Sequence, residues 1–255
     1  NDPQSTTRMQ CYSLPVKYIC YAILYSAVVL TGCQVPRPIL VIPEGANPSK
    51  WAPQIEEFLA IDDTTPMPKG GVVFVGSSSI RLWKTLTADM QPMPVLNRGF
   101  GGSRLFDSIY YSDDLISKHE PSLVVVFSGT NDISGNKPKS AQQVCSLFRQ
   151  LVRRLRWRDH KLTICNIAIT PTMAREEHIP LVHEANRLIR MECEADPLLE
   201  FVDPSVDLVD ADGKPDLKWF RADQLHLNRR GYAVWTRHIR PLVQRLYERE
   251  SVDSK

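Results

Sequence analysis

The chain has 255 residues, of which 43% are hydrophobic and 24% are charged. This composition provides enough apolar side chains for one large domain with short appendages, and it excludes wholesale disorder. Lys and Arg total 31 and Asp and Glu total 29, which gives a formal net charge of +2. That balance gives no electrostatic reason to expect nucleic acid as a partner.

The N-terminal part combines a basic residue, an apolar run and small residues. Lys17 precedes the apolar run 18–30, which is shorter than the about 20 residues that a membrane-spanning helix needs. This order is typical of a secretory signal peptide. The sequence Leu-Thr-Gly-Cys at 30–33 resembles the bacterial lipoprotein box, in which the Cys carries the lipid. Residues 1–8 precede Met9, and we interpret them as upstream sequence.

The lipoprotein interpretation divides the N-terminal part into two segments. We expect residues 1–32 to be upstream sequence and signal peptide, and Cys33 to be lipidated in a bacterial cell envelope. Gln34 follows the Cys, where an Asp would favour retention in the inner membrane, so we expect the outer membrane. A discarded signal peptide, or a buried helix with an incidental Cys, is the alternative. Residues 33–50 contain four prolines and are expected to form a linker.

The six cysteines do not form a disulfide framework. Two lie in the expected signal peptide and a third is the lipidation candidate. Three remain, an odd number without a Cys-x-x-Cys pair, and we expect them to be structural thiols: Cys145, Cys165 and Cys193.

Apolar strand-like runs alternate with helical patterns from Trp51 onward. Three β-branched runs predict buried strands at 71–76, 122–129 and 162–170, with a weaker one at 201–202 and a short edge strand at 93–96. Helices are predicted at 140–157, from its apolar stripe, and at 229–250, with a bend near Pro241. This alternation predicts an α/β fold with a mainly parallel sheet covered by helices on both faces.

Polar segments follow these strands, where ligands bind in open α/β sheets. They are Ser-Ser-Ser at 77–79, Asn-Arg-Gly-Phe-Gly-Gly-Ser at 97–103 and Gly-Thr-Asn-Asp at 129–132, and an Asp-x-x-His at 223–226 precedes the last helix. Singly, each has an ordinary structural explanation, because serines cap helices and Gly, Asn and Asp favour turns. Their joint occurrence, in this order, indicates one site.

The four segments resemble the blocks of the SGNH hydrolases, also called GDSL-type esterases and lipases. The resemblance extends from about Trp51 to the last helix, and it implies a single domain at 51–255 with a flavodoxin-like three-layer αβα sandwich. By motif, it assigns the catalytic residues and the oxyanion donors to Ser78, Gly102, Asn131, Asp223 and His226. Ser77 stands where the family most often has Asp, which affects the hydrogen bonds of the loop more than the chemistry.

The residue chemistry agrees with this assignment. Ser78 needs a base to become a nucleophile, and His226 is the best candidate, with Asp223 holding its Nδ1–H. The backbone N–H groups of Ser78 and Gly102 and the Asn131 side chain are the expected oxyanion donors. No metal or organic cofactor is required. We expect Ser77 to bond within its loop and Ser79 to cap the helix.

The predicted activity is hydrolysis of a small-molecule ester through an acyl-serine intermediate. Short loops and the lack of a long apolar lid favour short, acetyl-type acyl groups, as the resemblance to platelet-activating-factor acetylhydrolase-like esterases also implies. Arg98 and Arg104 flank the motifs and are candidates to contact the alcohol. The alternatives are a lysophospholipase or thioesterase acting on envelope lipids, and a non-catalytic flavodoxin-like or carbohydrate-binding lipoprotein.

Overall fold

The computed structural model describes residues 37–40, 42–43, 45–135 and 137–253. The predicted signal peptide and the predicted lipidation site at Cys33 lie outside these residues. No helix in the described part of the chain is both long enough and apolar enough to span a bilayer.

Five parallel strands form one sheet in the order β2-β1-β3-β4-β5. This is the flavodoxin-like strand order, so the predicted fold class is confirmed. The strands are β1 (Val72–Gly76), β2 (Val95–Gly99), β3 (Leu123–Phe127), β4 (Thr163–Ile167) and β5 (Leu199–Val202). Strand β2 extends to Gly99, which the sequence placed in a turn, because its backbone pairs with β1 as far as Gly76.

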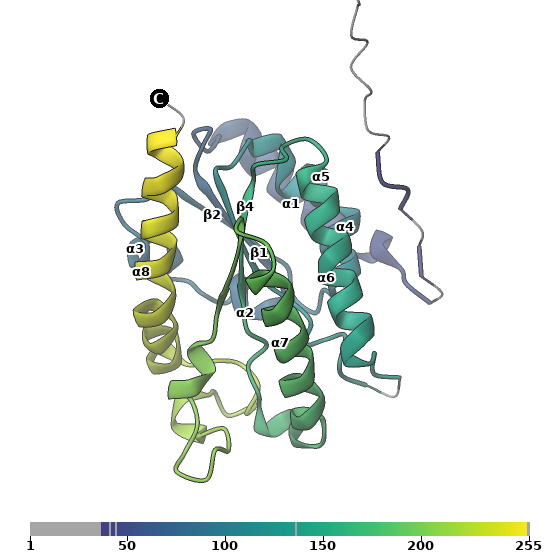
Figure 1. Ribbon diagram of the computed structural model, residues 1–255, viewed down its shortest axis with the longest axis vertical. Helices are drawn as coiled ribbons and strands as arrows, with labels where there is room; N and C mark the ends of the chain where they lie inside the picture. The colour runs from purple at the N-terminus through teal and green to yellow at the C-terminus, as the bar shows by residue number, and fades with distance from the viewer. Residues whose placement is uncertain (1–36, 41, 44, 136, 254–255) are drawn as a thin grey trace, which may run out of the picture. The chain divides into compact units, whose positions relative to one another are not determined.

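Helices cover both faces of the sheet, and Figure 1 shows α8 on one side with α6 and α7 on the other. The α-helices are α1 (Ala52–Thr64), α2 (Ser78–Arg81), α3 (Leu86–Asp89), α4 (Leu105–Tyr110), α5 (Ser112–Leu115), α6 (Ala141–Arg156), α7 (Ile179–Glu194) and α8 (Arg229–Asp253). Short 3-10 helices are η1 (Pro48–Trp51), η2 (Ser117–His119), η3 (Met173–His178), η4 (Pro204–Asp207) and η5 (Leu217–Trp219).

Successive residues of a strand contribute alternately to two separate hydrophobic cores. Val73 and Val75 of β1 pack with α1, α4, α6 and α7, whereas Val72 and Phe74 pack with α2, α3 and α8. Successive side chains of a strand point to opposite faces, so a continuous apolar run is what a strand buried on both faces requires. The predicted apolar stripe of α6 is buried in the first core.

The chain leaves β1 and β3 in opposite directions. After β1 it enters α2, on the α8 face, and after β3 it enters α6, on the other face. The two neighbouring strands therefore open a crevice at their carboxyl ends, where such sheets bind ligands. The segments 77–79 and 129–132 both lie at this crevice.

Contacts with the domain extend N-terminal to Trp51. Pro48 is buried, and its carbonyl oxygen accepts a hydrogen bond of 3.0 Å from Tyr111 Oη. Leu40 and Ala46 also pack against the core. Part of the segment 33–50 thus lies on the domain.

The cysteines of the domain are free and buried, as the sequence predicts for structural thiols. Burial raises the pKa of Cys165, and it raises that of Cys193 to about 12. Thiols with such pKa values are protonated and inert at neutral pH.

Candidate active site

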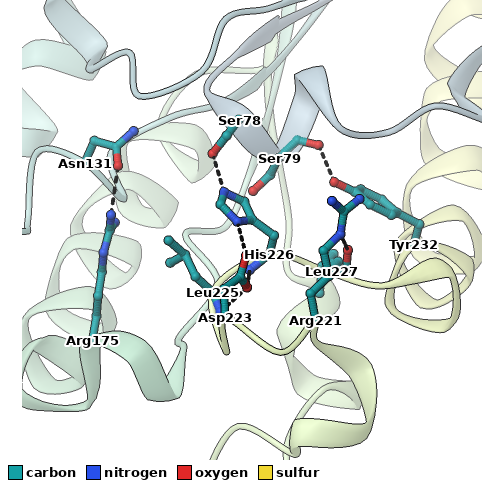
Figure 2. Close-up of polar contacts among 10 residues, drawn as sticks. All are labelled: Ser78, Ser79, Asn131, Arg175, Arg221, Asp223, Leu225, His226, Leu227 and Tyr232. Atoms are coloured by element: carbon teal, nitrogen blue, oxygen red, sulfur yellow. Dashed lines mark hydrogen bonds and ion pairs between the residues drawn. The ribbon is translucent and has the colours of Figure 1, made fainter.

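Ser78, His226 and Asp223 form a continuous chain of hydrogen bonds (Figure 2). Ser78 Oγ lies 2.8 Å from His226 Nε2, and His226 Nδ1 lies 2.7 Å from Asp223 Oδ2. Ser78 is the first residue of α2, and the other two lie between η5 and α8. The fold therefore brings together three side chains that the sequence separates by 148 positions.

The turn that carries Ser78 depends on a glycine. Gly76, the last residue of β1, has a φ of +149°, and a Cβ there would lie 1.9 Å from the Phe127 carbonyl oxygen of β3. The same oxygen accepts a hydrogen bond of 3.2 Å from the Ser77 N–H. Only a residue without a side chain allows this approach, which fixes where the chain turns into α2.

The three neighbouring serines have different environments. Ser77 is the N-cap residue of α2, and its buried hydroxyl makes no capping bond. The expectation that Ser79 caps the helix is wrong, because α2 already begins at Ser78. Instead, the Ser79 carbonyl oxygen accepts a hydrogen bond of 2.7 Å from Tyr232 Oη of α8.

Asp223 binds the backbone of its own turn with one carboxylate oxygen and the imidazole with the other. Its Oδ1 accepts hydrogen bonds from the N–H groups of Leu225 and His226, at 3.0 and 2.9 Å, and its Oδ2 faces His226 Nδ1. Desolvation raises the pKa of Asp223, but these hydrogen bonds outweigh it and lower the pKa to about 2. The carboxylate is therefore ionised at neutral pH. It accepts from Nδ1–H and leaves Nε2 free to accept the Ser78 proton.

Three N–H donors border an open hollow of about 360 Å³ that Ser78 and His226 also line. They belong to the backbone of Ser78 and Gly102 and to the side chain of Asn131. Within the described part of the chain, the N–H groups of Ser78 and Gly102 donate to no protein acceptor. Gly102 has a φ of +79° and Trp51 lies where its Cβ would point, so a larger residue would be strained and crowded there.

Arg175 is a site residue that the sequence analysis missed. Its Nη2 donates to Asn131 Oδ1 at 3.0 Å (Figure 2). Its Nη1 donates to the Thr130 carbonyl oxygen at 2.5 Å. Asn131 Nδ2 in turn donates to the Ser103 carbonyl oxygen at 2.9 Å. The amide is thus fixed at both ends, with its nitrogen on the side of the glycine-rich loop. Burial lowers the pKa of Arg175.

A second, more enclosed pocket lies beside Ser78. Its cavity volume, measured for a water-sized sphere, is about 10 Å³, about the room of one water molecule. Its lining residues are Ser77, Ser78, Ser79, Phe127, Thr130, Asn131, Thr170, Thr172, Arg175, Leu225, His226, Leu227 and Trp235. In the described residues, no group of three His, Cys, Asp or Glu side chains is placed to hold a metal ion.

Arg98 and Arg104, which the sequence suggested as contacts of the alcohol, line none of the hollows at or beside Ser78. Arg98 is 2% exposed, forms an ion pair with Asp62 of α1, and lies over the Phe58 ring at 4.8 Å. Burial lowers its pKa, and the Asp62 charge opposes that shift. Arg104 is the N-cap residue of α4. The first joins α1 to the sheet, and the second starts a helix.

Comparisons with known proteins agree with this geometry. The chain matches the model of the GDSL-like lipase/acylhydrolase family over residues 71–234. It is 28% identical over 208 residues to platelet-activating factor acetylhydrolase IB subunit alpha1 of Pongo abelii, covering 77% of this chain and 84% of that protein.

Solved structures share the fold. A GDSL-like lipase from Bacteroides thetaiotaomicron superposes with a TM-score of 0.64 at 18% identity, covering 78% of this chain and 98% of that one. A carbohydrate esterase family 3 protein from Talaromyces cellulolyticus gives a TM-score of 0.56 at 18% identity, covering 71% and 99%.

The family match spans more than half of the chain and includes every residue of the hydrogen-bonded site. It also contains the glycine-rich loop and the Gly-Thr-Asn-Asp segment. The chain therefore belongs to the GDSL-like lipase/acylhydrolase family, and it is a carboxylic ester hydrolase.

Proposed function

We propose that this hydrolase removes short, acetyl-sized acyl groups through an acyl-serine intermediate on Ser78. The observation that carries the proposal is the hydrogen-bonded chain from Asp223 through His226 to Ser78, with distances of 2.7 and 2.8 Å. A complete chain of this kind has no purpose in a binding module or in a decayed site, so it favours catalysis over both alternatives.

In the proposed mechanism, His226 Nε2 takes the proton of Ser78 Oγ as the oxygen attacks the ester carbonyl carbon. Asp223 stabilises the resulting imidazolium. The imidazolium then gives its proton to the departing alkoxide, and the C–O bond to the alcohol breaks. Water, deprotonated by the same Nε2, attacks the acyl-serine, the bond from Oγ to the acyl carbon breaks, and the imidazolium returns its proton to Ser78 Oγ as the acid leaves.

The tetrahedral intermediate carries a negative oxygen that needs donors. We assign this role to the N–H groups of Ser78 and Gly102 and to Asn131 Nδ2. Arg175 acts as a positioning residue, because its bond to Oδ1 holds the amide in one orientation. A donor that is already oriented costs no reorganisation during the reaction.

The enclosed pocket supports a preference for short acyl groups. It is closed by Leu225, Leu227, Phe127 and Trp235, and its room of about 10 Å³ is small. An acetyl methyl group would enter with little adjustment, whereas each further methylene must displace packed side chains. The names of relatives support the same preference, since one is a platelet-activating factor acetylhydrolase and another an acetylxylan esterase.

The acyl preference predicts a steep chain-length profile. With 4-nitrophenyl acetate, butyrate, hexanoate and octanoate, kcat/KM should be highest for acetate and fall by about 10-fold or more by hexanoate. The measurement is initial-rate kinetics with one leaving group throughout. A profile that is flat or rises with length would contradict the short-acyl assignment and favour the lysophospholipase alternative.

The position of the nucleophile predicts a single site of covalent labelling. A fluorophosphonate should modify Ser78 alone, and Ser78→Ala should abolish the adduct and the ester turnover above the level that binding and oxyanion donors sustain. Ser77→Ala and Ser79→Ala are the matched controls and should still be labelled. Mass spectrometry of the peptide that contains residues 77–79 identifies the labelled serine. An adduct on Ser77 or Ser79 would show that this residue, and not Ser78, is the nucleophile.

The positioning role of Arg175 predicts coupled effects. Asn131→Ala should lower kcat by about 10²–10³-fold with little change in KM. Arg175→Met should lower kcat less, because the amide then loses the bond to its Oδ1 but keeps the bond from Nδ2 to the Ser103 carbonyl oxygen. In the Asn131→Ala background, Arg175→Met should cost little further, which a double-mutant cycle measures. Arg187→Met, at an exposed position of α7, is the control, and additive effects would show that Arg175 acts independently of Asn131.

We further propose that Cys33 anchors the domain to a membrane through lipid. The sequence motif supports this proposal. Full-length protein produced in a bacterium should partition with membranes and incorporate labelled palmitate, and Cys33→Ala should lose the label while the domain keeps its specific activity. Recovery of unlabelled wild-type protein cleaved at another position would refute the anchor.

A further inference from the structure

Arg81 is a cation held beside the proposed nucleophile. It is the last residue of α2, one turn after Ser78, and its exposed side chain crosses the glycine-rich loop. A Cβ on Gly101 would lie 2.8 Å from Arg81 Nε and 3.0 Å from Nη2. The guanidinium therefore packs directly on the Gly101 backbone, in room that only a glycine leaves.

This guanidinium has no hydrogen-bond or ion-pair partner in the part of the chain that the structure describes. Two other arginines near the site are paired, Arg98 with Asp62 and Arg175 with Asn131. Arg81 thus remains available for a ligand on the site's open side.

Arg81 borders two adjoining hollows. The first has a volume of about 360 Å³, and Ser78 and His226 also line it. The second has a volume of about 370 Å³, and Lys84 lines it. Gln54 and Arg81 line both hollows. No described Asp or Glu lines either hollow. Asp223, the carboxylate of the site, is bonded to the opposite nitrogen of the imidazole. The open side of the site is therefore lined by cations and neutral groups.

If the acyl group occupies the enclosed pocket, the alcohol of the ester must lie in these open hollows. We propose that Arg81 selects esters whose alcohol carries an anionic group, a carboxylate or a phosphate. A planar guanidinium donates two parallel N–H bonds to either anion, which a neutral hydroxyl cannot match. The carboxylate of an acidic sugar and the phosphate of a glycerol lipid both present this chemistry. This inference rests on the proposed function, because it places the alcohol relative to Ser78.

The test compares charged and neutral esters of the same size. One pair is 3-acetoxybenzoate and 3-acetoxybenzamide, and the other is 3-acetoxypropyl phosphate and 3-acetoxypropan-1-ol. For each pair, the ratio of kcat/KM for the charged ester to that for the neutral ester is measured in wild type and in Arg81→Gln. Because Arg81 also packs on Gly101, next to the proposed donor Gly102, we expect absolute rates to fall for both esters, whereas the ratio isolates the contact with the alcohol.

We expect Arg81→Gln to lower the charged-to-neutral ratio by about 3- to 10-fold, as an exposed but oriented ion pair permits. The wild-type ratio should also fall with added salt, and the ratio of the variant should fall less, because Lys84 remains in the adjoining hollow. Arg153→Gln is the matched control, because it removes the same charge from the last turn of α6 and should leave the ratio at the wild-type value. Arg81→Lys should recover part of the preference.

Each outcome is decisive. A larger change for the phosphate pair assigns phosphate-bearing alcohols, and a larger change for the benzoate pair assigns acidic sugars or other carboxylates. An equal ratio in wild type and Arg81→Gln overturns the inference while ester hydrolysis stands. If wild type hydrolyses neither neutral ester and takes no fluorophosphonate label, the proposed function itself fails.

Discussion

The close approach of β1 and β3 at Gly76 is the constraint on which the site depends. No side chain fits between the two backbones there, so the chain must turn at once, and the next residues enter α2 on the face opposite α6. The same turn leaves the first N–H groups of α2 without intrahelical acceptors. One steric condition thus fixes the position of Ser78 and the direction of its side chain, and it leaves the Ser78 N–H, the proposed oxyanion donor, without an intrahelical acceptor.

Three arginines near the motifs show how burial and partners decide what a charge does. Arg98 is buried against Asp62 and Phe58 and holds α1 on the edge of the sheet. Arg175 is half-buried, and its guanidinium donates hydrogen bonds to the loop that carries Asn131. Arg81 is exposed and has no partner among the described residues. Residues of one type thus serve in the core, in the support of the site and at its open side.

The sequence predicted the features that depend on local pattern. Buried strands appear as continuous β-branched runs, and the residues of the site follow those strands in recognisable blocks. The sheet and the grouping of Ser78, His226 and Asp223 could therefore be predicted from the sequence. The role of Arg175 could not be predicted, because its partners lie 44 and 45 positions away and one of them is a backbone carbonyl. The extension of β2 to Gly99 and the capping pattern at Ser77–Ser79 depend on pairing with β1 and on where α2 begins, which residue types alone do not specify.

The bond from Tyr232 to the Ser79 carbonyl oxygen has a consequence for when the protein becomes active. Trp83, which follows α2, stacks on the Tyr232 ring with centroids 5.6 Å apart and meets Trp235 edge-on at the same distance. The turn of the nucleophile is thus held by the first two turns of the last helix. During synthesis from the N-terminus, β1 to β5 can pair before these residues emerge. A nascent chain would then carry a sheet whose α8 face is still uncovered and a Ser78 turn without support, so we expect the ability to cleave esters to be among the last properties it acquires.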